Sequence, residues 1–471
     1  MNTMSEELAA QIGECMRIEE IKYPLYPSQI LEPMEFTEKV DDIRRYALLA
    51  AEFGYNDEAR QYLNEFEESI RIIIGKFNAL LENPKEDPRE PEELEGIRAQ
   101  RPEGPRRLCG GIPDDYRERF LGSFLGRGAG CTLGAGLEFQ SVENMRIWAE
   151  HFGDTFPLTN YWSEVKNPEA PRYITGNATN LTKGHMDAIP VDDDTAYTLI
   201  GLLTLERFGP DFTHEQMAQL WNEEIEIHGK NGSWGLFWGE RKFIKNYRSG
   251  MEAGRAGYFQ NPNVQSVAAW TRADAWGYAA PGWPEKAAQL AYRDASANHR
   301  RNGVYGEMFM AAAVSAAFVV DDPKEALEIA LGEIPSESLF AEAVKWAFSI
   351  APTIHCYKDA VEAVTFRYKG MFEGHAINNA LYVIFGILIG GTDFTRVIGE
   401  TVAMGFDNDC TGATAGSIVG AVIGKKNLPS YWYEPFQNRV ECYFRSCPRY
   451  LDIDELEKRF RRQAENMYKE G

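Results

Sequence analysis

Cysteine is scarce in this sequence and follows no regular spacing. The 471 residues contain seven cysteines, an odd number, and no Cys-x-x-Cys pair occurs among them. Neither a disulfide framework nor a zinc knuckle is therefore predicted, because both need paired cysteines at short spacings. Free cysteines are typical of a reducing compartment, so we expect the protein to be cytoplasmic.

Positive charge is also in short supply. The chain has 49 lysine and arginine residues against 71 aspartate and glutamate residues, a net charge of −22 at pH 7. A surface this acidic repels phosphates, which argues against nucleic acid or an anionic membrane as a partner. The uncharged stretches 376–392 and 410–424 are shorter than the roughly 18 residues that span a membrane, so both are predicted to be buried core helices. No signal peptide is expected, because residues 1–7 carry no basic segment ahead of an apolar one.

Alternating patterns typical of β-strands are few, whereas apolar residues at three- and four-residue spacing recur along most of the chain. We therefore predict an all-α fold. Residues 1–108 are expected to form an N-terminal helical extension and linker, with helices over 41–55 and 57–81 and a proline-rich linker or ordered surface crossing at 83–107. Residues 109–471 are expected to form the main domain. Helices are predicted there at 116–136, 141–152, 192–208, 213–227, 264–278, 284–298, 303–319, 323–330, 336–350, 357–367, 373–390, 394–404, 410–424 and 452–468.

The second helix of the extension carries an apolar stripe made of Tyr62, Phe66, Ile70, Ile73 and Phe77. This stripe predicts that the extension packs against something, either as a cover over a cleft or as a dimer contact. The sequence leaves that choice, and the oligomeric state, open.

Two glycine stripes are the most unusual feature of the main domain. Both have a four-residue period, one in the segment 122–134 and one in the segment 412–424. Glycine inside a helix costs about 1 kcal/mol relative to alanine, so four glycines on one face need a structural reason. Close packing of the two helices, backbone against backbone, is the predicted reason.

Acidic residues form two clusters at the starts of predicted helices. Asp192, Asp193 and Asp194 open one predicted helix, and Asp407 and Asp409 stand at the head of the second glycine helix. Such residues often do no more than cap a helix and complement its dipole. Two such clusters at buried helix starts would repel each other without a cation, and hard oxygen donors favour Mg²⁺, Ca²⁺ or Mn²⁺. The number of carboxylates fits two ions that share a bridging ligand.

Three segments together resemble the ADP-ribosylglycohydrolase family. The segment 126–139 (GRGAGCTLGAGLEF) is similar to the family's opening glycine-rich helix, which ends in glutamate. The segment 192–195 (DDDT) resembles its Thr-Asp-Asp-Thr motif, and 405–413 (GFDNDCTGA) resembles its Gly-Gly-Asp-x-Asp-Ser/Thr-x-Gly-Ala motif. The resemblance covers residues 115–445 and implies an all-α glycohydrolase. Such an enzyme has two Mg²⁺ ions, with Mn²⁺ as an alternative, and cleaves ADP-ribose from a protein side chain or a related acceptor.

Transferred position by position, the resemblance implies a set of metal ligands. It assigns that role to the four aspartates at 193, 194, 407 and 409, with Asp409 as the bridging carboxylate, and places Glu138 beside the metals. Three residues depart from the family motifs: Asp192 replaces a threonine ligand, Cys410 replaces a serine or threonine, and Cys131 replaces an aspartate. Asp192 remains a hard ligand, whereas a thiol is a poor partner for Mg²⁺. Either Thr411 or a water is therefore expected to serve in place of Cys410, or one of the two metals binds weakly.

The same residues suit the chemistry of ribosyl hydrolysis. Two metal ions can hold the ribose hydroxyls and polarise a water, and a nearby carboxylate can accept its proton. The candidate catalytic residues are therefore Glu138, Asp193 and Asp409. By resemblance, Arg272 and Trp276 in the segment 268–277 border the cleft, and His299 reaches the substrate. Arg272 is expected to contact either a phosphate or Asp274, and an internal helix salt bridge is an equally good interpretation of this residue. For His299 a purely structural role is an equally good interpretation.

The substrate is left partly open. An ADP-ribosylated protein or another small ribosyl compound is the expected substrate, and the long aromatic stretch from Trp234 to Tyr258 either stacks a base or packs in the core. One alternative keeps the metals but hydrolyses a nucleoside or small glycoside. Another is a catalytically retired binding protein, an idea that rests on Cys131 and Cys410.

Overall fold

The computed structural model describes residues 33–82, 84–165, 178–225 and 236–470, and its architecture is all-α. The prediction of fold class is confirmed. Nearly every predicted helix of the main domain is present, with ends shifted by a few residues. The helices outside the centre of the body include α6 (Val142–Phe152), α8 (His214–Glu224), α12 (Pro284–Ala295), α14 (Pro323–Ala330), α15 (Leu339–Ile350), α16 (Tyr357–Arg367), α18 (Phe394–Ala403) and α20 (Ile453–Glu470). Short 3₁₀ turns connect them at η2 (Ala178–Leu181), η5 (Leu331–Glu333), η6 (Ala351–Thr353), η7 (Lys425–Asn427), η8 (Ser430–Trp432) and η9 (Glu434–Phe436).

Two antiparallel helices form the centre of the body. These are α5 (Tyr116–Ala135) and α19 (Asn408–Ile423), and their glycine stripes face each other. A Cβ atom placed on Gly126 would lie 2.3 Å from the carbonyl oxygen of Gly416, and one on Gly130 would lie 1.9 Å from that of Gly412. No side chain fits at these distances, so the predicted backbone-to-backbone packing is confirmed. It also brings the C-terminal end of α5 next to the N-terminal end of α19.

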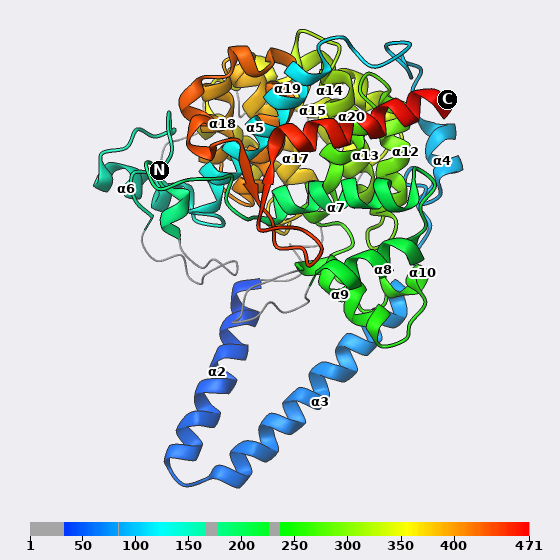
Figure 1. Cartoon of the computed structure of the whole chain (residues 1–471). Helices are drawn as coiled ribbons and strands as arrows, with labels where there is room; N and C mark the ends of the chain where they lie inside the picture. Colours follow the sequence, from blue (N-terminus) through cyan, green and yellow to red (C-terminus); the bar gives the residue numbers. More distant parts are fainter. Residues whose placement is uncertain (1–32, 83, 166–177, 226–235, 471) are drawn as a thin grey trace.

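Apolar helices surround this pair (Figure 1). α17 (Ala376–Gly390) and α18 pack beside α19, and α13 (Asn302–Ala317) is buried along its whole length. The uncharged runs predicted as core helices are thus α17 and α19. None of the described helices is long and apolar enough to cross a membrane.

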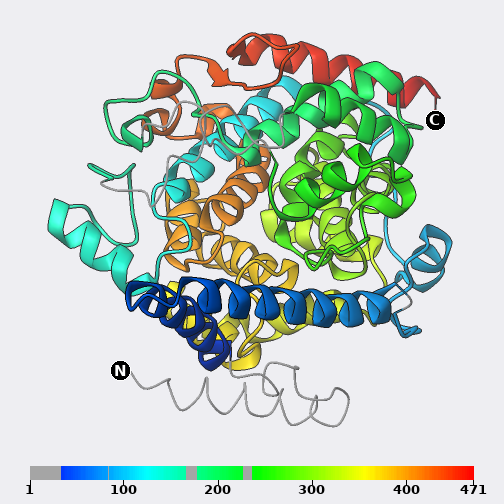
Figure 2. The same ribbon diagram turned by 90° about the horizontal axis from the view of Figure 1, so that it is seen from below.

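The first two described helices form an arm that projects from the body. α2 (Pro33–Glu52) and α3 (Asn56–Leu81) are joined at one end and diverge toward the other, as Figures 1 and 2 show. After the arm, the proline-rich stretch is an ordered surface crossing that contains the short helix α4 (Leu94–Gln100). Arg101 holds it to the body through an ion pair with Glu333 at 2.6 Å.

Three stretches differ from the predicted secondary structure. The stretch 228–265, expected to be irregular, contains α9 (Trp238–Arg248) and α10 (Ala253–Ala256); its first residues, including Trp234, lie outside the described part of the chain. The single helix expected at 264–278 is wrong: η4 (Val267–Arg272) precedes α11 (Ala273–Ala279). The cause is that Val267 and Gln265 exchange backbone hydrogen bonds with the 374–376 segment, which keeps the chain extended before η4.

The third difference is a small sheet near the C-terminus. β1 (Arg439–Glu441) pairs antiparallel with β2 (Tyr450–Asp452), with Val440 opposite Leu451. Ile189 joins Val440 on the other side in a parallel bridge. Three-residue strands are too short to give a periodic pattern, so no prediction could have found them. The bridge positions the segment that leads into α7 (Asp193–Phe208).

Candidate metal centre

Helix ends bring the predicted acidic residues together. Asp192 precedes α7 and its carboxylate accepts the backbone N–H of Asp194 at 3.1 Å, so it caps the helix. Asp407 likewise occupies the N-cap position of α19, but its side chain accepts no capping hydrogen bond from the helix backbone. The aspartates of the two motifs, at 192, 193, 194, 407 and 409, are each at most 9% exposed. Helix capping therefore explains why Asp192 is buried, but it does not explain the burial of the other four aspartates.

Three overlapping groups of side chains have ligand atoms within 4.8 Å of one another. Asp194 belongs to two of them and Asp407 belongs to two, so the groups form one continuous cluster. The groups are Glu138 with Asp407 and Asp409, Asp194 with Asp407 and Cys410, and Cys131 with Asp192 and Asp194. The structure thus gathers Glu138 and four of the five predicted aspartates, and it also turns both departing cysteines toward them.

Two further predicted residues lie at the edge of this cluster. Asp193 lines the adjoining cavity but belongs to none of the three groups. Thr411 is buried in the first turn of α19, and its Oγ1 makes no hydrogen bond within the described part of the chain. The metal role of both residues stays a prediction.

The electrostatics of the cluster favour a bound cation. Burial raises the pKa of Asp194 well above its ordinary value, and the neighbouring carboxylates of Asp409, Asp193 and Asp192 raise it further. The pKa of Asp407 is raised for the same reasons, by burial and by Asp409 and Glu138. Ionised carboxylates this close and this dry are stable only with bound positive charge, so the donor set fits hard divalent cations.

Arg127 supplies part of that charge, and sequence reasoning missed it. Its Nη2 lies 3.4 Å from Asp194 Oδ1, its Nε donates to the Asp194 carbonyl oxygen at 2.7 Å, and its Nη1 pairs with Asp274. Two carboxylates thus share one guanidinium. The signal was present, because Arg127 is the only charged residue between Arg119 and Glu138.

The two buried thiols have their sulfur atoms close to the acidic cluster, and Cys410 also belongs to the apolar core. Burial raises the pKa of Cys131, and Asp192 and Asp194 raise it further. The pKa of Cys410 is raised by burial and then by Asp194 and Asp407. These carboxylates disfavour the thiolates, which keeps both sulfurs weak ligands for Mg²⁺.

A cavity of about 150 Å³ adjoins the acids. Glu138, Asp193, Asp194 and Asp407 line one part of it, whereas aromatic side chains line another. The aromatic residues are Phe139, Phe237 and Trp238.

The backbone around this cavity is constrained. Phe139 and Trp238 have positive φ angles of 55° and 28°, values that only surrounding packing can hold. The backbone N–H of Phe139 donates to the carbonyl of Phe406, itself at φ 59°. Gly374 has no room for a Cβ, because one would lie 2.1 Å from the Trp238 ring. The aromatic wall is therefore held in place from both sides.

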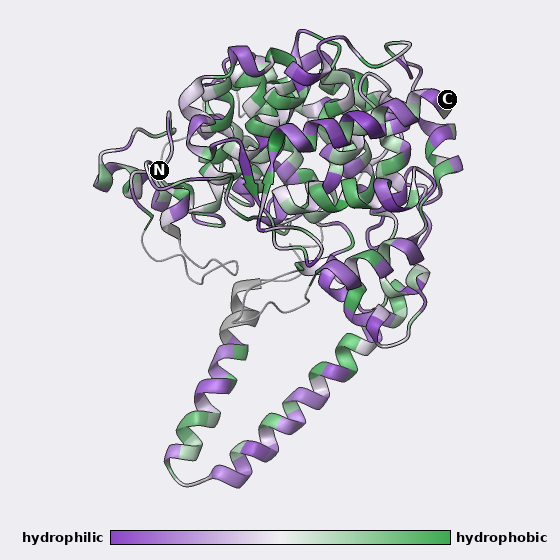
Figure 3. Ribbon diagram, in the orientation of Figure 1, coloured by the Kyte–Doolittle hydropathy of each residue, from purple (hydrophilic) through white to green (hydrophobic). Residues whose placement is uncertain are grey.

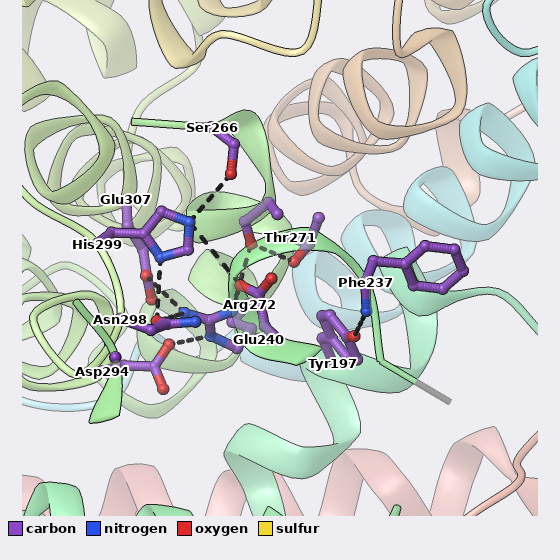
Figure 4. A network of polar contacts seen from close by, with 12 residues as sticks. Tyr197, Phe237, Glu240, Ser266, Thr271, Arg272, Asp294, Asn298, His299 and Glu307 are labelled. Atoms are coloured by element: carbon purple, nitrogen blue, oxygen red, sulfur yellow. Dashed lines mark hydrogen bonds and ion pairs between the residues drawn. The ribbon is translucent and has the colours of Figure 1, made fainter. Parts of the chain in front are cut away.

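The predicted substrate-binding residues are fully buried, and Arg272 and His299 belong to a separate polar network (Figure 4). Arg272 pairs with Asp294 and with Glu240 at 2.8 Å, so the expected contact with Asp274 is wrong; Asp274 pairs with Arg127 instead. Trp276 donates its indole N–H to Glu307 at 2.7 Å. None of these side chains lines the cavity beside the acids.

His299 belongs to the same network. Its Nε2 lies 3.1 Å from Ser266 Oγ and 3.9 Å from Glu240 Oε1. Burial and the nearby Arg272 hold the pKa of His299 well below its ordinary value. These contacts are internal, and the substrate-binding roles of Arg272, Trp276 and His299 stay predictions. The network nevertheless anchors α9, because Glu240 is a residue of this helix (Figure 4). Trp238 of the cavity wall lies two residues before Glu240 on the same helix.

Comparison with known proteins identifies the family. The family model described as ADP-ribosylglycohydrolase matches residues 112–469. A solved structure described as "ADP-ribosylglycohydrolase-related protein complex" is 19% identical, with a TM-score of 0.45, and the match covers 76% of this chain and 100% of that one. No curated protein matches. The match to the family model spans most of the chain and includes all three motifs, so the chain belongs to the ADP-ribosylglycohydrolase family.

Proposed function

We propose that the protein is a Mg²⁺-dependent hydrolase that cleaves the glycosidic bond of an ADP-ribosyl or related ribosyl group. The observation that carries this proposal is the convergence of Glu138 and the buried aspartates of α7 and α19 beside a small cavity with an aromatic wall. Family membership supports glycohydrolase chemistry. A cytoplasmic location remains part of the proposal.

The acidic cluster would hold the metal through Asp192, Asp194, Asp407 and Asp409, all of which offer the oxygen donors that Mg²⁺ and Mn²⁺ prefer. Two bound ions would bind the vicinal ribose hydroxyls and lower the pKa of a water. Two of the three ligand groups contain Asp407, and in those two groups only the thiol of Cys410 is a poor donor for such ions.

Glu138 is the best candidate for the proton acceptor. It is half-buried at the cavity, whereas Asp194 and Asp409 are at most 1% exposed, so among these three it is the one a water in the cavity can reach most easily. A carboxylate that accepts a proton from the attacking water completes hydrolysis of a bond that breaks through an oxocarbenium-like state. Arg127 positions Asp194 through two contacts, one to its backbone carbonyl oxygen and one to its carboxylate.

The aromatic wall favours a ring-bearing substrate. Trp238 and Phe139 lie with ring centroids 6.0 Å apart and add apolar surface to the cavity that the acids also line. Such surfaces pack against a sugar face or a base. The described lining of this cavity contains no lysine or arginine that would neutralise a diphosphate. That observation supports a second candidate, hydrolysis of an uncharged nucleoside or small glycoside by the same site.

The test is release of free ADP-ribose from an ADP-ribosylated peptide, with Mg²⁺, with Mn²⁺ and with a chelator. Wild-type protein is expected to lose activity in the chelator, and Asp409→Asn is expected to be inactive throughout. Asp322→Asn is the control, because Asp322 caps α14 as Asp192 caps α7 but lies outside the cluster. Release that survives the chelator in both wild type and Asp409→Asn would contradict the metal role.

A substrate screen separates the two candidates. Turnover of purine and pyrimidine nucleosides without turnover of ADP-ribosylated peptide would select the nucleoside hydrolase. If no substrate turns over while Mg²⁺ still binds, the protein is a retired member of the family that binds rather than cleaves.

A further inference from the structure

The arm formed by α2 and α3 exposes an unusual amount of apolar surface. Of the nineteen large hydrophobic side chains that are exposed in the described part of the chain, fourteen lie between residues 43 and 81. Hydrophobic positions recur along both helices of the arm in Figure 3. These side chains are Ile43, Tyr46, Leu48, Leu49, Phe53, Tyr55, Tyr62, Leu63, Ile72, Ile73, Ile74, Phe77, Leu80 and Leu81. Isolated exposed apolar residues are ordinary, but a concentration of this size marks an interaction surface.

The spacing of apolar residues on α3 is that of a helix-packing seam. Residues at alternating intervals of four and three run from one end of the helix to the other: Ala59, Leu63, Phe66, Ile70, Ile73, Phe77 and Leu80. This heptad pattern continues for three repeats, which is the signature of a helix that packs against partner helices along its whole length.

The first half of this seam is only partly covered. Ala59 is 7% exposed and Phe66 and Ile70 are partly buried where α2 runs beside α3, whereas Leu63 is 39% exposed. Further along, α2 and α3 diverge, as Figure 1 shows, and Phe77 and Leu80 are 61% and 68% exposed. The seam therefore continues past the point where the chain's own helix can fill it.

The charges of the arm indicate what kind of partner fits. Residues 39–82 contain nine acidic and six basic side chains. The basic ones lie among acids on the same helix, as in the pairs Arg71–Glu68 at 2.6 Å and Arg45–Asp42 at 3.9 Å. A mixed surface with a slight acidic excess does not attract phosphates or an anionic bilayer. It does suit another amphipathic helix with interspersed charges of both signs.

The exposed area is large enough for a stable contact between two copies. The fourteen side chains are between 36% and 72% exposed. At about 150 Å² for each large side chain they expose on the order of 1,000 Å² per chain. A standard interface buries about 800 Å² per partner.

We propose that the arm is a dimerisation element. The uncovered half of the α3 seam packs against the same half of α3 in a second copy, and the other exposed apolar side chains of both hairpins are buried as the hairpins close into a four-helix interface. Such a contact is isologous, because the same apolar patch supplies both sides. Four-helix packing covers a seam that two diverging helices leave open. The proposal does not depend on the enzymatic activity.

The test is the molar mass of the full chain in solution, measured by light scattering or sedimentation velocity across a dilution series. Wild type is expected to be dimeric at about 10 µM, since an interface of this size reaches micromolar affinity or better. The double variant Ile73→Gln/Phe77→Gln is expected to dissociate at least about 100-fold more readily, because each central apolar side chain is worth tenfold or more in affinity.

A matched control removes a similar apolar surface elsewhere. Ile147→Gln/Phe366→Gln replaces the same two residue types at exposed positions of α6 and α16, where they are 51% and 47% exposed. This variant is expected to remain dimeric, and circular dichroism checks that both variants keep their helix content. A dimer that survives Ile73→Gln/Phe77→Gln overturns the proposal.

Two other results would also overturn it. One is a wild-type chain that stays monomeric but dimerises when residues 1–32 are deleted, which would show that this segment covers the arm. The other is a monomer that binds vesicles of phosphatidylcholine and phosphatidylserine and loses that binding in Ile73→Gln/Phe77→Gln, which would make the arm a lipid-binding element.

Discussion

Replacing Gly130 with alanine tests the packing that builds the site. A Cβ there would lie 1.9 Å from the carbonyl oxygen of Gly412, and such atoms essentially never approach closer than 3.0 Å. The helices must therefore separate by about 1 Å, while the contacts of Gly126 with Gly416 resist that movement. Overpacking of this kind costs roughly 1–3 kcal/mol or more, against a gain of about 1 kcal/mol from helix propensity. Because both sides of the contact are backbone, we expect a net loss of about 2 kcal/mol.

The assay is urea unfolding followed by tryptophan fluorescence. The first tryptophan of the chain is Trp148, so this signal reports on the body and not on the arm. Gly75→Ala is the control, because Gly75 lies inside α3 and a Cβ there would meet nothing within 4 Å. It should leave the unfolding midpoint of the body unchanged. A Gly130→Ala variant as stable as wild type would refute the idea that the glycine stripes are needed for close packing.

Three other expectations follow from the same contacts. Cys410→Thr should raise the affinity for Mg²⁺ by roughly tenfold in isothermal titration, because a hydroxyl oxygen is a harder donor than a buried thiol; an unchanged affinity would mean that position 410 does not contact the ion. Arg127→Met should lower the free energy of unfolding by about 3–5 kcal/mol in urea titrations, because it leaves Asp274 buried without its cation, and a loss below 1 kcal/mol would contradict the pairing. Burial lowers the pKa of His375 to about 4. Between about pH 6.5 and 4, this imidazole is therefore protonated in the unfolded chain but neutral in the folded chain. Stability is therefore lost as pH falls through that window, by up to about 3 kcal/mol. His375→Asn, which can still cap α17, should show a smaller loss in thermal melts at pH 7 and pH 4.5, whereas an equal loss in both proteins would contradict the role of His375.

Much of the site was predictable because its elements have strong local signals. A four-residue glycine period places all the glycines on one face, and only another backbone fits against such a face; Gly126 and Gly416 meet as that reasoning requires. Consecutive acids at helix starts place carboxylates at fixed points, and antiparallel packing of α5 and α19 then brings Glu138 to Asp407 and Asp409.

Other parts depend on tertiary contacts that no local pattern encodes. Arg127 is a single charge in an apolar helix, and its partners are far away in sequence. Asp274 was one of two expected contacts of Arg272, the other being a phosphate, yet the fold directs Arg272 to Asp294 and Glu240. The aromatic wall needs a positive φ at Trp238, which packing imposes against local preference.

The central claim is that the acidic cluster binds divalent cations, and Mn²⁺ anomalous diffraction from soaked crystals tests it most directly. The account predicts anomalous peaks within ligand distance of Asp194 and Asp407 in wild type. It predicts loss of at least one peak in Asp407→Asn, with the fold unchanged. Crystals that show no peak among these carboxylates at millimolar Mn²⁺ would contradict the account.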